Sequence, residues 1–310
     1  MSDEKELRRA FPPKRDLILW WLVNVSASFF LSGAHNVFFF VSDLRTPVIH
    51  FLHYFSTTLF LFVFYILGLF PKQQAFPSKE FLMPVGAKFL ETFLSSIVHA
   101  QNRTGGLYLL RIFDFLTTLT ILKFAQKFQL SSAEKPANHH MIWIGLSASL
   151  SWLEFGQMEY TWFSLICSPL LPISRAFSIL TLWNCAQKLR PQSMDFFSMQ
   201  YCALSSLALA IPALFSFLSR SVEVSASWES IDWVLLYLSP IFMSSLVYSE
   251  LWFLLVAGPK SLQIADHSKY LAASIGQWII QNMAHPSILA LIGKILFGAS
   301  AYRMIAHRFS

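Results

Sequence analysis

Charged residues are scarce in this 310-residue sequence: Asp, Glu, Lys and Arg together make up 13% of it. A soluble globular domain contains roughly 25% of these residues, so the sequence excludes a chain built of ordinary soluble domains. Cysteine is also rare, and Cys167, Cys185 and Cys202 each lie inside or at the edge of an apolar run. Cysteines in such positions are typically small buried side chains, which argues against a disulfide framework or a zinc site.

Apolar residues are what the chain has in abundance: 55% of it is hydrophobic, with 31 Phe and 10 Trp. Apolar runs of about 20 residues recur from end to end, and this length crosses the hydrocarbon core of a bilayer. Polar, Pro and Gly breaks separate the runs. We therefore predict an all-α polytopic membrane protein. Its ten transmembrane helices are expected at residues 17–41, 47–70, 80–100, 105–126, 141–157, 161–185, 194–218, 231–257, 261–282 and 286–306.

Basic residues orient these spans. With a cytosolic N-terminus, alternate loops and both tails collect fourteen lysines and arginines, whereas the opposite loops hold only Arg45, Arg103 and Arg220. The positive-inside rule expects this asymmetry for short loops, so both termini are predicted to be cytosolic. The positive charge then lies at the membrane edge, where anionic lipid headgroups explain it, and nucleic-acid binding is set aside. The charged residues 1–16 form no cleavable signal peptide.

Ionisable residues inside the spans are candidates for function, because a charge at mid-bilayer costs about 2.5–3.5 kcal/mol on insertion scales. Three pairs of opposite charge are spaced three residues apart, namely Lys88/Glu91, Arg111/Asp114 and Asp266/Lys269. This spacing puts both members on one helix face, so each pair also has a purely structural interpretation as a buried contact.

Arg175 differs from these pairs. It lies near the middle of its span with no acidic residue within one helical turn, so its partner must come from another helix or from a ligand. Pro169 and Pro172 precede it, which predicts a kinked or broken helix, and broken helices often build polar cavities in transporters.

Several motifs occur in an order that resembles the triose-phosphate/nucleotide-sugar translocators of the drug/metabolite transporter superfamily. In "GPKSLQIADHSKY", Gly258-Pro259 stands for the family's Ser-Pro, Asp266 occupies its small or amide position, and Lys269 follows ten residues after the proline. Tyr270 replaces the Arg that often completes a basic pair. Arg111 and Arg175 match basic residues of the family's fourth and sixth helices. Asn36 in "SGAHNVFFF" is similar to the Asn of its first-helix signature, which here lacks the following Lys.

The resemblance implies two five-helix halves of inverted topology, here residues 17–157 and 161–306, with short cytosolic tails at 1–16 and 307–310. It also implies an antiporter for a nucleotide sugar or similar phosphorylated organic anion in the Golgi or endoplasmic reticulum membrane. The implied substrate-binding residues are Arg111, Arg175, Lys269, Asp266, Asn36 and Tyr270. No cofactor is indicated, and a homodimer is left open.

Two alternatives stay open at this stage. The missing basic residues beside Arg111, Asn36 and Lys269 are compatible with a transporter-like protein that lost the ancestral substrate and acts as a partner or regulator, or carries a less charged solute. An enzyme has little support. His50 and His53 share one helix face and are capable of binding a metal, but no carboxylate or cysteine pattern joins them.

Overall fold

The computed structural model describes residues 13–38, 44–71, 74–101, 162–219 and 229–280, with single residues at 117–124 and 292–302. The described chain is helical and contains no strand, as predicted. The continuous helices are α2 (Lys14–Asn36), α3 (Thr46–Ile66), α4 (Ser78–Gln101), α7 (Trp162–Leu189), α8 (Met194–Leu218), α9 (Ser230–Trp252) and α10 (Pro259–Ile280), with a π-helical turn, η3 (Phe253–Ala257), after α9. Seven of the ten predicted spans are therefore helices. The spans predicted at 105–126, 141–157 and 286–306 lie outside the continuously described residues.

Local sequence signals explain where several helices begin. The Ser193 hydroxyl accepts a hydrogen bond from the Phe196 N–H at 3.2 Å and so caps α8. At the start of α9, the Glu229 N–H donates to the Asp232 carboxylate at 2.9 Å. Gly258 separates η3 from α10 with φ +88°, a conformation that favours glycine. Pro259 then opens α10 at the position where a helix tolerates a missing N–H.

The sequence predicted a kinked or broken helix before Arg175. A break is wrong, because α7 continues from Trp162 to Leu189 through both Pro169 and Pro172; the kink stays a prediction. The Ser174 hydroxyl in the same turn donates to the Leu171 carbonyl at 2.8 Å. Proline removes one backbone donor but does not end a helix whose neighbours support it, and α4 packs along α7 over much of its length.

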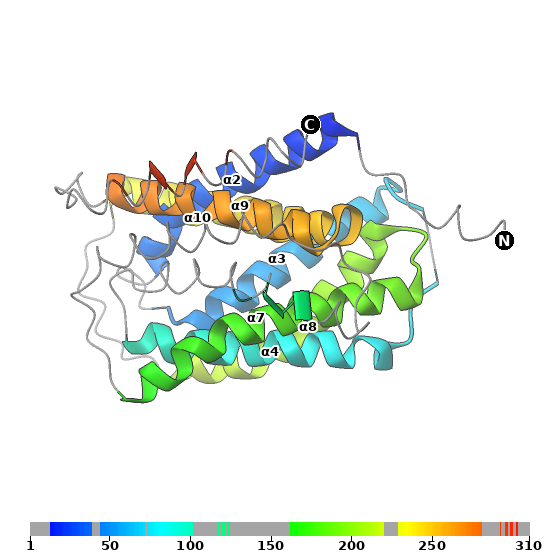
Figure 1. Ribbon diagram of the computed structural model, residues 1–310, viewed down its shortest axis with the longest axis horizontal. Helices are drawn as coiled ribbons and strands as arrows, with labels where there is room; N and C mark the ends of the chain where they lie inside the picture. The colour runs from blue at the N-terminus through cyan, green and yellow to red at the C-terminus, as the bar shows by residue number, and fades with distance from the viewer. Residues whose placement is uncertain are drawn as a thin grey trace.

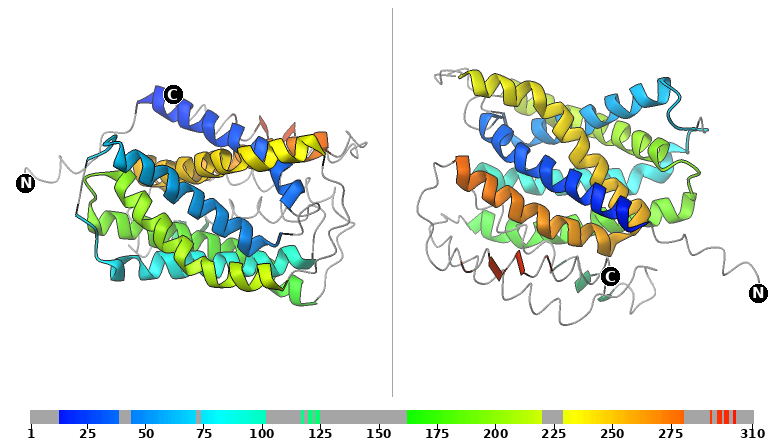
Figure 2. Two further views of the ribbon diagram at one scale, coloured as in Figure 1. Left: turned by 180° about the vertical axis from the view of Figure 1, so that it is seen from behind. Right: turned by 90° about the horizontal axis from the view of Figure 1, so that it is seen from above.

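The helices fall into two groups that α3 joins. In Figure 1, α2, α9 and α10 lie along one side of the bundle and α4, α7 and α8 along the other, with α3 between them. The views in Figure 2 agree. Within the first group α2 packs on both α9 and α10, and in the second α4 packs on α7. The middle helix α3 contacts α8, α9 and α4.

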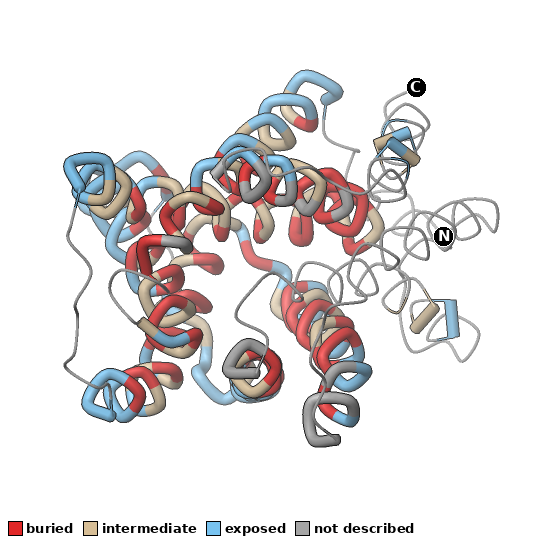
Figure 3. The backbone as a smooth tube through the Cα atoms, turned by 90° about the vertical axis from the view of Figure 1, so that its left-hand side faces the viewer, coloured by how far each residue is buried: buried red, intermediate tan, exposed pale blue. Residues whose placement is uncertain are grey.

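Burial in the described bundle is typical of a helical protein surrounded by lipid. Large apolar side chains face outward, as Leu207, Ile211, Phe215 and Leu218 do along α8. Charged side chains are buried instead, including Lys88, Glu91, Asp266 and Lys269, and Figure 3 shows exposed positions on the outer faces of the helices. Within the part of the chain that the structure describes, five helical segments, in α2, α3, α4, α8 and α9–η3, are long and apolar enough to cross a membrane. These features fit the predicted multi-pass membrane protein.

Candidate functional site

Six ionisable side chains from four helices form one continuous ion-pair network, which we call the central network: Lys88 and Glu91 (α4), Arg175 (α7), Glu250 (α9), Asp266 and Lys269 (α10). Its formal charge is zero, because three cations meet three carboxylates. All six side chains are at most 20% exposed. Burial on this scale removes most of the water that would otherwise solvate the charges, so each depends on its partners.

Arg175 is the centre of the network. One guanidinium nitrogen lies 3.0 Å from Glu91, and the other lies 3.4 Å from Glu250 and 3.3 Å from Asp266. These carboxylates belong to both helix groups, α4 on one side and α9 and α10 on the other. Arg175 therefore joins the two groups electrostatically. The sequence left another helix or a ligand as the source of its partner, and the structure shows partners on three other helices.

Lysines complete the network at both ends. On α4 the Lys88 ammonium lies 2.9 Å from Glu91, and on α10 the Lys269 ammonium lies 2.6 Å from Asp266. Both pairs are three residues apart, so the sequence prediction that each would meet on one helix face is confirmed. Lys269 also contacts Glu250 at 2.5 Å. Glu250 lies near the end of α9, shortly before the tight connection at Gly258. Its contact with Lys269 therefore links α9 to α10.

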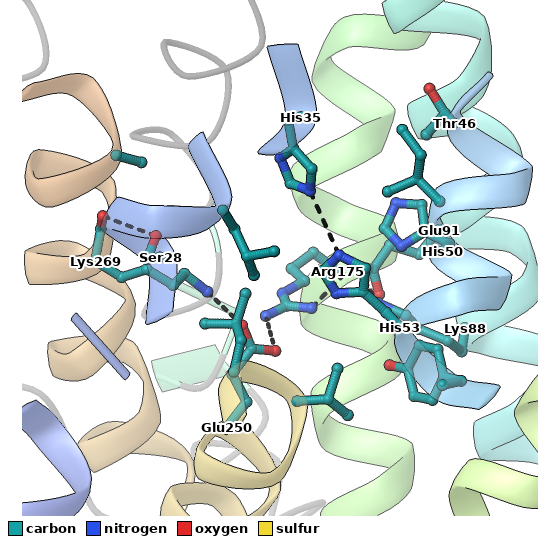
Figure 4. A pocket seen from close by; sticks show the side chains of 16 residues that line it. Ser28, His35, Thr46, His50, His53, Lys88, Glu91, Arg175, Glu250 and Lys269 are labelled. Atoms are coloured by element: carbon teal, nitrogen blue, oxygen red, sulfur yellow. Dashed lines mark hydrogen bonds and ion pairs between the residues drawn. The ribbon is translucent and has the colours of Figure 1, made fainter. Parts of the chain in front are cut away.

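A cavity of about 110 Å³ adjoins the central network. Five of the six network residues line it, and Ser28, His35, Thr46, His50 and His53 are among its other polar lining residues (Figure 4). The imidazoles of His35 and His53 face one another, with their Nε2 atoms 3.4 Å apart. The cavity thus combines balanced fixed charges with groups that both donate and accept hydrogen bonds.

A polar stripe along α2 holds the helix against α9 and α10. The Trp21 indole donates to the Ser268 hydroxyl at 2.7 Å, and the Asn24 amide donates to Ser249 at 2.9 Å. One and two turns farther along, Ser28 donates to the Lys269 carbonyl at 3.3 Å and Ser32 lies against Gly276. Residues three or four apart share a helix face, so α2 presents polar groups to its neighbours at every turn. The contact with Lys269 fixes the backbone that carries one of the network's cations.

The structure brings together three of the six predicted site residues. Arg175, Asp266 and Lys269 meet in the central network, although Asp266 contacts the cations without lining the cavity. Arg111 lies outside the described residues. Asn36 is the last residue of α2 and Tyr270 lies on α10, but the side chains of both are outside the description.

Three network members were not among the predicted site residues. Lys88 and Glu91 had been identified as an intramembrane pair, and Glu250 lies within the span predicted at 231–257. The charge inside an apolar run was the signal that pointed to all three. Glu250 contacts a residue 75 positions away and another 19 positions away, so its partners were not readable from helical spacing.

Two aromatic side chains with polar groups, Tyr248 and Trp183, pack outside the cavity. Tyr248 donates its hydroxyl to Asp195 and meets the Trp20 ring edge to face, with centroids 5.0 Å apart. Trp183 packs against a buried apolar cluster. Neither lines the cavity, so both serve the packing role that is more common in a chain so rich in aromatic residues.

Comparisons with known proteins identify solved structures that share the fold of this chain. No protein-family model and no curated protein matches the chain. Seventeen chains of solved structures match, including one described only as "Crystal structure of protein". That chain has a TM-score of 0.63 and 11% sequence identity, over 90% of this chain and 94% of its own length. At this identity the likeness shows a shared fold alone.

Proposed function

We propose that this protein is a secondary transporter that moves a small, weakly charged organic anion across an organelle membrane by alternating access. One observation carries the proposal: a charged, hydrogen-bonding cavity lies inside a bundle whose outer faces are apolar. Ionisable residues within membrane helices that face a cavity typically mark a solute or ion pathway. Arg175 and Lys269 are the proposed anion-binding residues, as the sequence predicted.

The packing of the helices supports the predicted inverted halves. If α2, α3 and α4 correspond to α7, α8 and α9, the contact of α2 with α9 maps onto the contact of α7 with α4. The contact of α3 with α9 maps onto that of α8 with α4, and α3 with α8 maps onto itself. All of these contacts occur. Transporters built from such repeats bind solute between them and open alternately to either side.

The central network also suggests how the cavity would open. Arg175 approaches Glu250 and Asp266 at 3.3–3.4 Å, which are the longest contacts of the network, and they cross between the two helix groups. The contacts on each side of this crossing are shorter. We expect the two groups to separate at this point and each to retain internally paired charges. Opening would then leave a net charge of +1 on the α4–α7 side and −1 on the α9–α10 side, with Arg175 facing the carboxylates it has left.

Charge balance and size favour a small solute over the nucleotide sugar implied by the family resemblance. Both candidate cations already contact carboxylates, so a diphosphate would add about two negative charges to a site whose fixed charges cancel. The cavity of about 110 Å³ is also well below the roughly 300–1,000 Å³ of sites for larger organic ligands. Among the solutes considered from the sequence, the less charged class therefore fits this cavity better.

A thermal-shift panel on the purified protein tests this function. The ligands are inorganic phosphate, lactate, a triose phosphate, uridine monophosphate and a uridine-diphosphate sugar. A ligand at a hundredfold excess over its Kd stabilises the folded state by about 2.7 kcal/mol. We expect a rise in melting temperature with a small anion and a smaller or no rise with the nucleotide sugar.

Two variants locate the binding site. Lys269→Met with Asp266→Asn removes one cation and one carboxylate together, so the network stays neutral, and it should abolish the shift. Lys188→Met removes an exposed cation that pairs with Glu80 outside the cavity and should retain the shift. The Arg111→Ala variant tests the candidate that lies outside the described residues. If no ligand raises the melting temperature of the folded wild-type protein, the transporter proposal is rejected in favour of a structural or regulatory partner.

A further inference from the structure

His35 and His53 form an imidazole pair across the interface between α2 and α3. Their Nε2 atoms are 3.4 Å apart, and their ring centroids lie 5.6 Å apart at an interplanar angle of 30°. His50 lies one turn before His53 on the same face, with ring centroids 6.3 Å apart. All three line the cavity, and Figure 4 shows them beside Arg175.

A metal is not the occupant that this geometry favours. Among the described residues, no group of three His, Cys, Asp or Glu side chains is arranged to hold a metal ion. The facing pair itself supplies only two nitrogens, fewer than the three or four protein ligands of a typical zinc site.

The geometry of the pair instead favours a proton shared between the two imidazoles. A hydrogen bond between two imidazole nitrogens needs one N–H and one lone pair, so the Nε2 atoms share a single proton between them. Protonating both inner nitrogens would point two donors at each other. Uptake of one further proton at an outer nitrogen converts the neutral pair into a monocation, and imidazole ordinarily makes this change between about pH 5 and 8.

The charged residues around the pair determine how this extra charge changes the net charge of the site. Besides the pair, the titratable and charged side chains that line the cavity are His50 and Tyr54 (α3), Lys88 and Glu91 (α4), Arg175 (α7), Glu250 (α9) and Lys269 (α10). With Asp266, which contacts Arg175 and Lys269, the fixed charges of the described residues sum to zero. No described residue of α8, the other helix packed on α3, lines the cavity. A proton on the pair therefore gives the site a net charge of +1.

We propose that the His35–His53 pair is a proton-coupling site, so that one proton binds together with each monovalent anion. This inference rests on the proposed function, because it requires an anion to bind beside Arg175 and Lys269. The proton supplies the positive charge that the balanced network lacks, and the anion in turn favours protonation of the pair. Such coupling is reciprocal by thermodynamic necessity, and chains of His, Asp and Glu carry protons in many transporters.

The first test needs no anion. Selective ¹⁵N labelling of the nine histidines, with His35→Gln and His53→Gln for assignment, follows each ring by NMR between pH 5 and 8. We expect the two rings to titrate together and to account for one proton. Removing either partner should move the midpoint of the other by about one pH unit, a tenfold change in proton affinity. His50→Gln, one turn away, should leave the shared titration in place.

The second test joins the proton to the anion. Inorganic phosphate or lactate is added to the purified protein in weakly buffered detergent solution, and proton uptake is read with a pH indicator while calorimetry measures binding. The wild-type protein should take up about one proton per bound lactate, with affinity falling about tenfold per pH unit above the midpoint of the pair. His53→Gln should bind the anion with little proton uptake.

The two tests distinguish failure of the proton coupling from failure of the proposed function. Anion binding without proton uptake would overturn the coupling and leave the proposed function standing. Absence of binding by every anion in the panel would overturn the function and the coupling together. Independent titration of the two histidines, or no titration between pH 5 and 8, would overturn the shared proton site whatever the anions do.

Discussion

Replacing Arg175 is the most informative perturbation of this structure. Arg175→Met leaves Glu91, Glu250 and Asp266 with only Lys88 and Lys269, so the buried network changes from neutral to a net charge of −1. Removing one partner of a buried ion pair typically costs about 3–5 kcal/mol, because a charge remains buried without compensation. At roughly 2 °C for each kcal/mol, we expect the melting temperature to fall by about 6–10 °C.

A second variant separates lost charge balance from lost packing. Adding Glu250→Gln to Arg175→Met restores neutrality and leaves two intact pairs, Lys88 with Glu91 and Asp266 with Lys269. Glu250 is the carboxylate to replace because Glu91 and Asp266 are each the helical-turn partner of a lysine, so each remaining pair lies within one helix. We expect the double variant to recover at least half of the lost stability, since the remaining loss reflects side-chain packing alone.

An exposed ion pair provides the matched control. Lys188 lies only 2.7 Å from Glu80, closer than Arg175 lies to any carboxylate, yet its side chain is 68% exposed. Solvent screens such a pair, so Lys188→Met should not change the melting temperature. Unfolding is followed by the fluorescence of the ten tryptophans in detergent. Equal losses in Arg175→Met and Lys188→Met, or a double variant no more stable than the single one, would refute the buried network.

Further predictions concern three glycines, read out by the same unfolding assay. A Cβ at Gly276 would collide with the Ser32 hydroxyl and lie 3.1 Å from the Phe29 carbonyl, so Gly276→Ala should separate α2 from α10 and cost about 1–3 kcal/mol. Gly86→Ala in α4, where a Cβ meets nothing within 4 Å, should instead stabilise by up to about 1 kcal/mol, and equal effects at both sites would contradict the α2–α10 contact. Gly258→Ala forces an alanine to φ +88° and should cost about 1–3 kcal/mol; an unchanged melting temperature would show that the connection between α9 and α10 adopts another conformation.

The sequence predicted the helices well because their determinants are local. Apolar runs of membrane-spanning length and the Pro, Gly and polar breaks between them placed seven helices within a few residues of their observed bounds. The tight break at Gly258-Pro259 was readable for the same reason. A break in α7 was a wrong prediction, because proline's effect on a helix depends on the neighbours that support it, whereas a kink there stays a prediction. The resemblance to the nucleotide-sugar translocators, its inverted halves and its substrate remain predictions.

For the candidate site, the sequence by itself determined which charges lie inside the membrane helices and which of them meet one helical turn apart. Lys88 with Glu91 and Asp266 with Lys269 needed only the geometry of a helix. Only the tertiary structure decided that Arg175 joins both pairs, that Glu250 completes the network, and that His35 faces His53. Those contacts connect different helices, and their distances depend on how the helices pack. The charge balance among the described residues of the cavity is therefore a property of the packed bundle.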